Sequence, residues 1–258
     1  MPGRPPGGNR MNRRPGLPPA VAAEVERLQE QMGLPREVAL RVAREEITLN
    51  QVLEDMASRD RADMLMRRHG LDRALATQIA KGQADLERVL TRRRLASHLA
   101  LNADRSCLVD AHKEGRAWRF SLLGQRQVTA RVVELDQYEV SLHAAGAEEP
   151  EAIHKLQFKL AWRPEQDKQV RRGFRTDKAL RASPRDPASR PQDRYGCSNR
   201  RLFGWMEAET PISVTTLEGD IVQGAVSWFG RYEFGITVKG KAEVVVFRHA
   251  LAQVCERR

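Results

Sequence analysis

The sequence has few cysteines and no long apolar run. Cys107, Cys197 and Cys255 lie far apart and form no C-x-x-C pair, so neither a disulfide framework nor a zinc ribbon is predicted. No run of 18 apolar residues occurs, and the first residues contain no apolar stretch typical of a signal peptide. We therefore expect a soluble protein of the reducing cytoplasm that does not contact the membrane.

Catalytic and metal-binding motifs are also missing. The six histidines show no H-x-x-x-H or mixed Cys/His spacing, and the chain contains no G-x-S-x-G motif and no glycine-rich phosphate loop. No cysteine lies in a reactive signature. The sequence therefore predicts a protein that is not an enzyme and that carries no metal or other cofactor.

Positive charge is present in excess and is unevenly distributed. The formal net charge is +10; residues 1–18 carry four arginines and no acidic residue, and residues 163–201 hold twelve basic and five acidic residues. The rest of the chain is close to neutral. Pro- and Arg-rich composition of this kind predicts a disordered basic arm at 1–18 and a disordered basic linker at 163–198. Concentrated positive charge favours polyanions, of which RNA and DNA are the commonest.

A duplicated helical pattern follows the arm. Residues 33–53 and 70–90 align at an offset of 37 residues, so that apolar positions such as Leu34 and Val42 fall on Leu71 and Ile79. Within each copy the apolar residues recur at spacings of three and four, as in amphipathic helices. The sequence therefore predicts an all-α helical repeat bundle over residues 19–103, either with no chemistry of its own or with a protein partner.

Beyond residue 104 the pattern changes to alternating, β-branched segments. Residues 104–162 and residues 199–258 each open with a short helical segment and continue as short strands. Gly224 lies inside one of these strands, where a sharp bend leaves no room for a side chain. The expected fold is α+β and multidomain: the helical bundle is followed by two small five-stranded β-barrels joined by the disordered linker.

The second β module contains two motifs at a characteristic distance. The first comprises Leu217-Glu218-Gly219, Val222-Gln223-Gly224 and Phe229-Gly230-Arg231-Tyr232, and the second is Phe247-Arg248-His249-Ala250-Leu251. This stretch resembles the Sm-like domain of the bacterial RNA chaperone family Hfq over about 55 residues. It departs from the family at Gly230 and Arg231, where Asp and Gln are usual, and the duplicated helical region has no counterpart there.

The resemblance implies an RNA site in the second module. In the family the aromatic of the second motif lies beside stacked bases, the basic residue lies near phosphate, and the histidine donates a hydrogen bond. Single-stranded RNA is held by such stacking and charge. The predicted RNA-binding residues are Arg231, Tyr232, Phe247, Arg248 and His249, and we expect Arg248 and His249 to lie outside the core.

The first β module is a weaker copy of the second. Asp136, Gln137 and Tyr138 match the first motif, and Phe158 and Lys159 are aligned with the start of the second, where Leu160 replaces the histidine. Gln137, Tyr138, Phe158 and Lys159 are therefore also predicted to bind RNA. The resemblance further implies a homo-oligomer in which the fourth strand of one module pairs with the fifth strand of another, between chains or within one.

Two functions agree with these observations. The first is an RNA-binding, chaperone-like protein of post-transcriptional regulation, which binds single-stranded or uridine-rich RNA. The second is an assembly or scaffold protein, in which the barrels only associate through their edges and the helical domain binds a protein partner. The basic segments and the retained Phe247-Arg248-His249 favour the first, and the mutual departures of the two modules favour the second.

Overall fold

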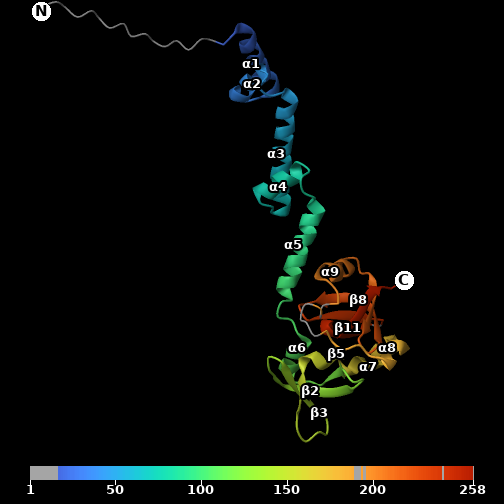
Figure 1. Cartoon of the computed structure of the whole chain (residues 1–258). Helices are drawn as coiled ribbons and strands as arrows, with labels where there is room; N and C mark the ends of the chain where they lie inside the picture. Colours follow the sequence, from blue (N-terminus) through green and yellow to red (C-terminus); the bar gives the residue numbers. More distant parts are fainter. Residues whose placement is uncertain (1–16, 189–192, 194–195, 240, 258) are drawn as a thin grey trace, which may run out of the picture. The chain divides into compact units, whose positions relative to one another are not determined.

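The computed structural model describes residues 17–188, 193, 196–239 and 241–257 (Figure 1). The chain divides into two compact units, Met1–Val89 and Leu90–Arg258. Nearly all of the predicted basic arm lies outside the described residues. In the described part, no helix is both long enough and apolar enough to span a bilayer.

The first unit consists of helices that repeat one arrangement twice. The helices are α1 (Pro19–Met32), α2 (Arg36–Ala43), α3 (Leu49–His69), α4 (Arg73–Ala80) and the beginning of α5 (Leu86–Leu101). Gly33 and Gly70, which are 37 residues apart, both end a helix in the left-handed conformation that glycine adopts at low cost. The ends of α1 and α3 therefore recur at the 37-residue spacing of the sequence.

The predicted single bundle is wrong, because the two repeats have separate cores. Leu28 and Ala39 belong to the first core, and their counterparts Leu65 and Ala76 belong to the second. The 21-residue helix α3 contributes to both cores through Val52 near its start and Leu65 near its end. At about 1.5 Å per residue a helix of this length spans roughly 30 Å, which keeps the two cores apart.

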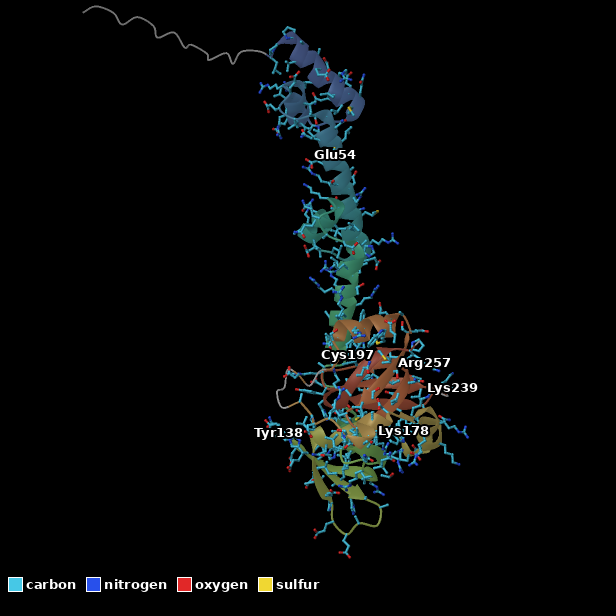
Figure 2. All side chains as sticks on the ribbon, turned by 45° about the vertical axis from the view of Figure 1, so that its right-hand side comes forward. Glu54, Tyr138, Lys178, Cys197, Lys239 and Arg257 are labelled. Carbon is cyan, nitrogen blue, oxygen red and sulfur yellow. The ribbon has the colours of Figure 1, made fainter. Side chains whose placement is uncertain are left out.

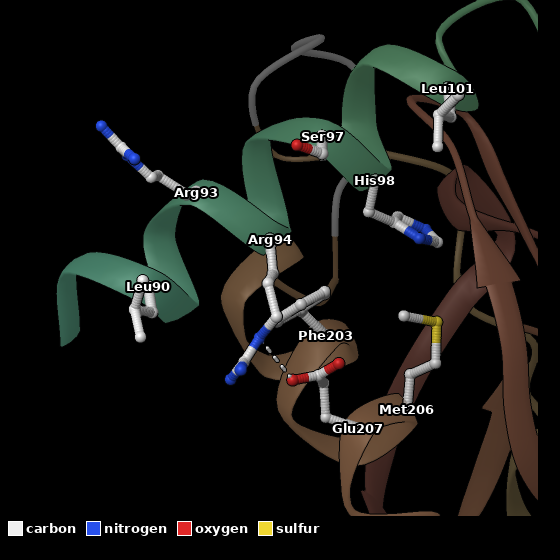
Figure 3. A pocket seen from close by; sticks show the side chains of 9 residues that line it. All are labelled: Leu90, Arg93, Arg94, Ser97, His98, Leu101, Phe203, Met206 and Glu207. Atoms are coloured by element: carbon white, nitrogen blue, oxygen red, sulfur yellow. Dashed lines mark ion pairs between the residues drawn. The ribbon is translucent and has the colours of Figure 1, made fainter. Parts of the chain in front are cut away.

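The second half of α5 belongs to the second unit. Leu95 and Leu99 pack against the core of that unit, and Arg94 forms an ion pair of 3.0 Å with Glu207 (Figure 3). The His98 ring lies 4.2 Å from the Phe229 ring, measured between centroids. The division between the units therefore falls inside α5, whereas the sequence suggested a boundary at residue 103.

The second unit is built around a sheet with short helices, at the positions that the sequence indicated. Its first half contains α6 (Cys107–Glu114), β1 (Trp118–Leu122), β2 (Gln127–Leu135), β3 (Glu139–Ala144), β4 (Glu151–His154), the short 3-10 helix η1 (Lys155–Gln157) and β5 (Phe158–Trp162). Its second half contains α9 (Asn199–Glu207), β7 (Pro211–Thr216), β8 (Asp220–Phe229), β9 (Glu233–Val238), β10 (Glu243–Phe247), the 3-10 helix η4 (Arg248–Ala250) and β11 (Leu251–Glu256).

The prediction of two separate five-stranded barrels is wrong. The strands form one open antiparallel sheet in the order β11-β7-β8-β9-β10-β5-β1-β2-β3-β4, and β6 (Arg175–Thr176) adds an eleventh strand beside β8. The two halves are joined where β10 pairs with β5, with Val245 opposite Ala161. The order β5-β1-β2-β3-β4 in the first half matches the order β11-β7-β8-β9-β10 in the second half. The pairing of β10 with β5 makes the two halves one continuous sheet.

The joint forms because β5 and β10 each bury apolar side chains on both faces. Leu160 and Val244 face the core of the second half, whereas Ala161 and Val245 face the core of the first half. Strands buried on both faces are expected to be continuous runs of apolar residues, as "VVVF" in β10 shows. Separate barrels would expose one of these faces to water.

The predicted disordered linker is also wrong for most of its length. Residues 164–182 form η2 (Pro164–Gln166), α7 (Asp167–Gly173), β6 and α8 (Lys178–Ala182). Val170 is fully buried in the core of the second half, and the Phe174 ring packs at 5.5 Å from the Trp162 ring. These two apolar side chains anchor a segment whose composition is otherwise basic and polar.

Gly224 lies where no side chain fits, as the sequence predicted, because β9 approaches β8 closely at this position. A Cβ atom at this position would collide with the carbonyl oxygen of Thr237 in β9. The ladder between β8 and β9 then changes register between Val226 and Trp228. As a result Val226 packs in the core of the second half, and Trp228 packs in the core of the first.

Candidate nucleic-acid interface

Two loops with the same backbone structure lie at equivalent ends of the two sheet halves. In the second half, residues 230–233 connect β8 to β9, and the Gly230 N–H donates to the Glu233 carbonyl at 2.8 Å. In the first half, residues 136–139 connect β2 to β3, and the Asp136 N–H donates to the Glu139 carbonyl at 3.0 Å. We call these segments the tyrosine loops, because each carries a tyrosine in its third position.

Both tyrosines are largely exposed to solvent. Tyr232 is 57% exposed and Tyr138 is 63% exposed, and Figure 2 shows Tyr138 at the surface. The Arg231 guanidinium lies 5.1 Å from the centre of the Tyr232 ring, and the Gln137 side chain donates to the Tyr138 hydroxyl at 3.0 Å. The four residues Arg231, Tyr232, Gln137 and Tyr138 thus form two accessible aromatic platforms with polar neighbours.

A basic residue supports each loop from the following 3-10 helix. The Arg248 N–H donates to the Tyr232 carbonyl and the Lys155 N–H donates to the Tyr138 carbonyl, both at 2.8 Å. Their side chains repeat the pattern, since Arg248 Nη1 donates to the Gly230 carbonyl at 3.1 Å and Lys155 Nζ to the Asp136 carbonyl at 2.5 Å. Each basic residue therefore positions its loop.

The structure places Arg248 in the core, so the expectation that it lies outside was wrong. Its side chain is 4% exposed, and its guanidinium also donates to the Asn199 side chain at 2.7 Å and to the Cys197 carbonyl. These partners precede and begin α9. Arg248 consequently joins the tyrosine loop of the second half to the start of α9, and its Nη1 and Nη2 groups donate to protein oxygen atoms.

The neighbours of Arg248 in the motif are buried or partly buried. Phe247 lies in the core of the first half, with its ring 5.6 Å from the Phe158 ring. His249 is partly buried, and its ring lies 5.8 Å from that of Phe247. Phe247 therefore stabilises the joint between the halves and does not present its ring as a stacking surface.

The alignment of Phe158 and Lys159 with the second motif was one strand too late. Both residues lie in β5, the equivalent of β11, whereas η1 is the equivalent of η4. The true counterparts of Phe247 and Arg248 are His154 and Lys155, which sequence reasoning missed. The signal in the sequence was Lys155, a basic residue directly after a short strand. It was missed because the residue before it is His154 and not an aromatic such as Phe247.

Lys159 forms a buried ionic network. It is 1% exposed, and its Nζ contacts Asp220 Oδ2 at 2.7 Å and also contacts a carboxylate oxygen of Glu218. Glu218 in turn accepts from the N–H groups of Gly124 at 2.5 Å and Gln125 at 3.0 Å. Burial alone would raise the pKa of Glu218, but the bonds from Lys159 and these two N–H groups outweigh it and hold the pKa below its ordinary value.

No protein-family model matches this chain, and no curated protein shows significant similarity to it. In the described part of the chain, no three His, Cys, Asp or Glu side chains are grouped so as to hold a metal ion. The tyrosine loops present exposed rings, the Arg231 guanidinium and the Gln137 amide, which are groups for stacking, charge attraction and hydrogen bonding.

Proposed function

We propose that the protein binds single-stranded RNA in the cytoplasm and acts in post-transcriptional regulation, with the two tyrosine loops as its contact points. The observation that carries the proposal is the exposure of Tyr138 and Tyr232 at equivalent positions of the two halves. A large aromatic ring fixed by its backbone and open to solvent is a platform on which a base can stack. The net charge of +10 supplies attraction to the phosphate backbone.

The two loops differ in the chemistry that they add to stacking. Arg231 contributes a cation beside Tyr232, which favours a phosphate or a stacked base. Gln137 contributes an amide beside Tyr138, which can donate to or accept from a base edge. The resemblance of residues 210–254 to the Hfq Sm-like domain supports uridine-rich RNA as the first ligand to examine.

A double variant with Tyr138→Ala and Tyr232→Ala tests the proposal. Stacking is worth about 1–3 kcal/mol per base, so affinity for a single-stranded oligouridine should fall by tenfold or more. The matched control is Tyr138→Phe with Tyr232→Phe, which keeps both rings and should bind nearly as the parent does. Unchanged affinity in the alanine variant would show that the tyrosine loops do not contact the RNA.

A second candidate function, assembly, is favoured by the two edges of the sheet. In the part of the chain that the structure describes, β4 pairs only with β3, and β11 pairs only with β7. These edge strands occupy the places in their halves that β10 and β5 occupy at the joint. Open edges are templates for pairing with another chain. A homo-oligomer could therefore form by pairing β4 of one copy with β11 of the next, and the helical unit would then serve a protein partner.

Binding and assembly can be separated by one comparison. If RNA affinity depends on Tyr138 and Tyr232 in a protein of unchanged mass, RNA binding is the function. If the alanine variant binds as the parent does while the mass shows a defined oligomer, the scaffold function is the better conclusion.

A further inference from the structure

A small cleft lies over the joint between the two halves of the sheet. It has a volume of about 200 Å³ and is lined by residues from both halves and from the segments around them. Trp118 at the start of β1 and Val245 in β10 lie in its lining, and Trp228 near the end of β8 lies there too. None of these residues belongs to the tyrosine loops.

Each tryptophan in the cleft is covered by an arginine. The guanidinium carbon of Arg105 lies 3.9 Å from the centre of the Trp228 ring, and that of Arg163 lies 4.2 Å from the centre of the Trp118 ring. Arg105 is exposed and Arg163 is partly exposed, whereas both indoles are nearly buried. The cleft is therefore bordered by two planar guanidinium–indole pairs, and the guanidinium groups are the accessible members.

Hydrogen bonds hold the inner side of the cleft in place. The Trp228 indole N–H donates to the Glu243 carboxylate, and the Glu243 backbone N–H donates to the Gln166 side-chain oxygen at 3.1 Å. On the outer side, Arg163 donates to both carboxylate oxygens of Glu114. These bonds fix Trp228 and Arg163 before any ligand arrives, which lowers the entropic cost of binding.

Charge in the cleft selects against simple ions. Arg105 and Arg163 are offset by Asp110 and Glu243, which also line the cleft. A free phosphate would meet two carboxylates. A cationic ligand would have to displace the arginines that already cover the indole faces.

A flat, uncharged ring with N–H donors meets neither obstacle. It can stack on the accessible face of a guanidinium, while its N–H groups donate to Asp110 or Glu243. An apolar cavity of about 150 Å³ admits benzene, so a single base is compatible with the volume of this cleft.

We propose that this cleft binds one nucleobase of a single-stranded RNA, by stacking on the exposed face of the Arg105 guanidinium that covers Trp228 and by hydrogen bonding to Glu243 or Asp110. The proposal rests on the proposed RNA-binding function and adds to it a third contact point, distinct from the tyrosine loops. The cleft exists only where the halves meet, so it would hold a base between segments that are far apart in the sequence.

The test uses the full-length chain and a single-stranded RNA with one 5-iodouridine at varied positions. Photocrosslinked peptides would be identified by mass spectrometry, and affinity would be measured for Arg105→Ala and for Arg105→Lys. Lysine keeps the charge but loses the planar stacking group, so both variants should lose about tenfold in affinity. Arg92→Ala, which removes an exposed arginine of α5 outside the cleft, is the matched control and should lose much less.

The outcomes separate this proposal from the general function. Crosslinks to peptides that carry Arg105, Trp228 or Glu243, together with equal losses in both Arg105 variants at an unchanged melting temperature, would support the cleft. If the tyrosine variants weaken binding but neither Arg105 variant does, the cleft is structural and RNA binding stands. If the parent binds no single-stranded RNA, both proposals fail. Binding of a trimethyllysine peptide in place of RNA would assign the cleft to a cation.

Discussion

Lys159 of β5 and Asp220 of β8 form an ion pair of 2.7 Å that joins the two halves of the sheet. Lys159 also contacts Glu218, whose carboxylate accepts from the turn between β1 and β2. The strand joint between β5 and β10 is therefore supported by a second, ionic connection between the same halves.

Replacement of Lys159 by alanine should strongly destabilise the second unit. It would leave the buried Glu218 without its cation and leave the partly buried Asp220 with only Arg181, at 3.4 Å. Breaking a buried ion pair costs about 3–5 kcal/mol. Denaturant unfolding would measure the loss. Lys168→Ala removes an exposed lysine of α7 and should change the free energy of unfolding by less than about 0.5 kcal/mol. Equal effects of the two substitutions would contradict the network.

Substitution of Arg248 should lower stability, whereas substitution of Arg231 should weaken RNA binding. Arg248→Ala leaves the Cys197 and Gly230 carbonyls without their donor, so the free energy of unfolding should fall by about 1–3 kcal/mol. Arg231→Ala removes an exposed side chain and should leave stability nearly unchanged while weakening RNA binding. Thermal melts and RNA titrations on both variants check this. A stable Arg248 variant would refute the structural role of its guanidinium.

Glu233 should make the stability depend on pH. Burial raises the pKa of this carboxyl group, although it accepts from the Cys107 N–H at 3.1 Å, which opposes the rise. Because the pKa of Glu233 is raised in the folded state, its contribution to the free energy of unfolding is complete below the ordinary pKa of about 4.3. This contribution is lost as the pH rises through the pKa of the folded state. Glu233→Gln keeps an acceptor and has no such loss. Its melting temperature relative to the parent should therefore increase from pH 4 to pH 7, and a decrease over this range would oppose the assignment.

The edge strands predict self-association that one proline should block. Bonds alternate along the β3–β4 ladder, and the Lys155 N–H donates to Tyr138, so the N–H of Ala152 faces away from β3. Ala152→Pro removes an outward donor without removing a bond to β3. The mass in solution should shift from oligomer toward monomer in this variant, whereas Ala152→Val should keep the parent mass. A parent that is monomeric at all concentrations would end the edge-pairing model.

RNA affinity should depend steeply on salt, because phosphate contacts release counterions. For single strands the slope of log affinity against log salt is about −0.7 per contact. Replacing Arg4, Arg10, Arg13 and Arg14 with glutamine should reduce the slope by at most about 3 if all four contact phosphate. Titrations at several salt concentrations would measure this. A flat slope for the parent would remove electrostatics from the proposed function.

The sequence by itself determined the local elements and the internal repeats. Apolar periodicity located most of the helices and strands, and the 37-residue offset predicted that the helical pattern of the first unit occurs twice, although not that each copy has its own core. Gly224 marked a position in β8 where no side chain fits, and Tyr138 and Tyr232 were identified correctly as counterparts. These features depend on short-range spacing and on the conformational freedom of single residues, which a sequence records directly.

Only the tertiary structure decided how these elements combine. The pairing of β10 with β5 depends on two apolar faces meeting across residues far apart in the chain, and the same run of letters would suit a separate barrel. In the sequence, Arg248 and Lys159 look like basic residues of the surface. In the structure, carbonyl and carboxylate groups from distant segments surround their side chains. The cleft with Trp118 and Trp228 likewise exists only because the halves join. Burial and partner identity are properties of long-range contacts, which no local pattern encodes.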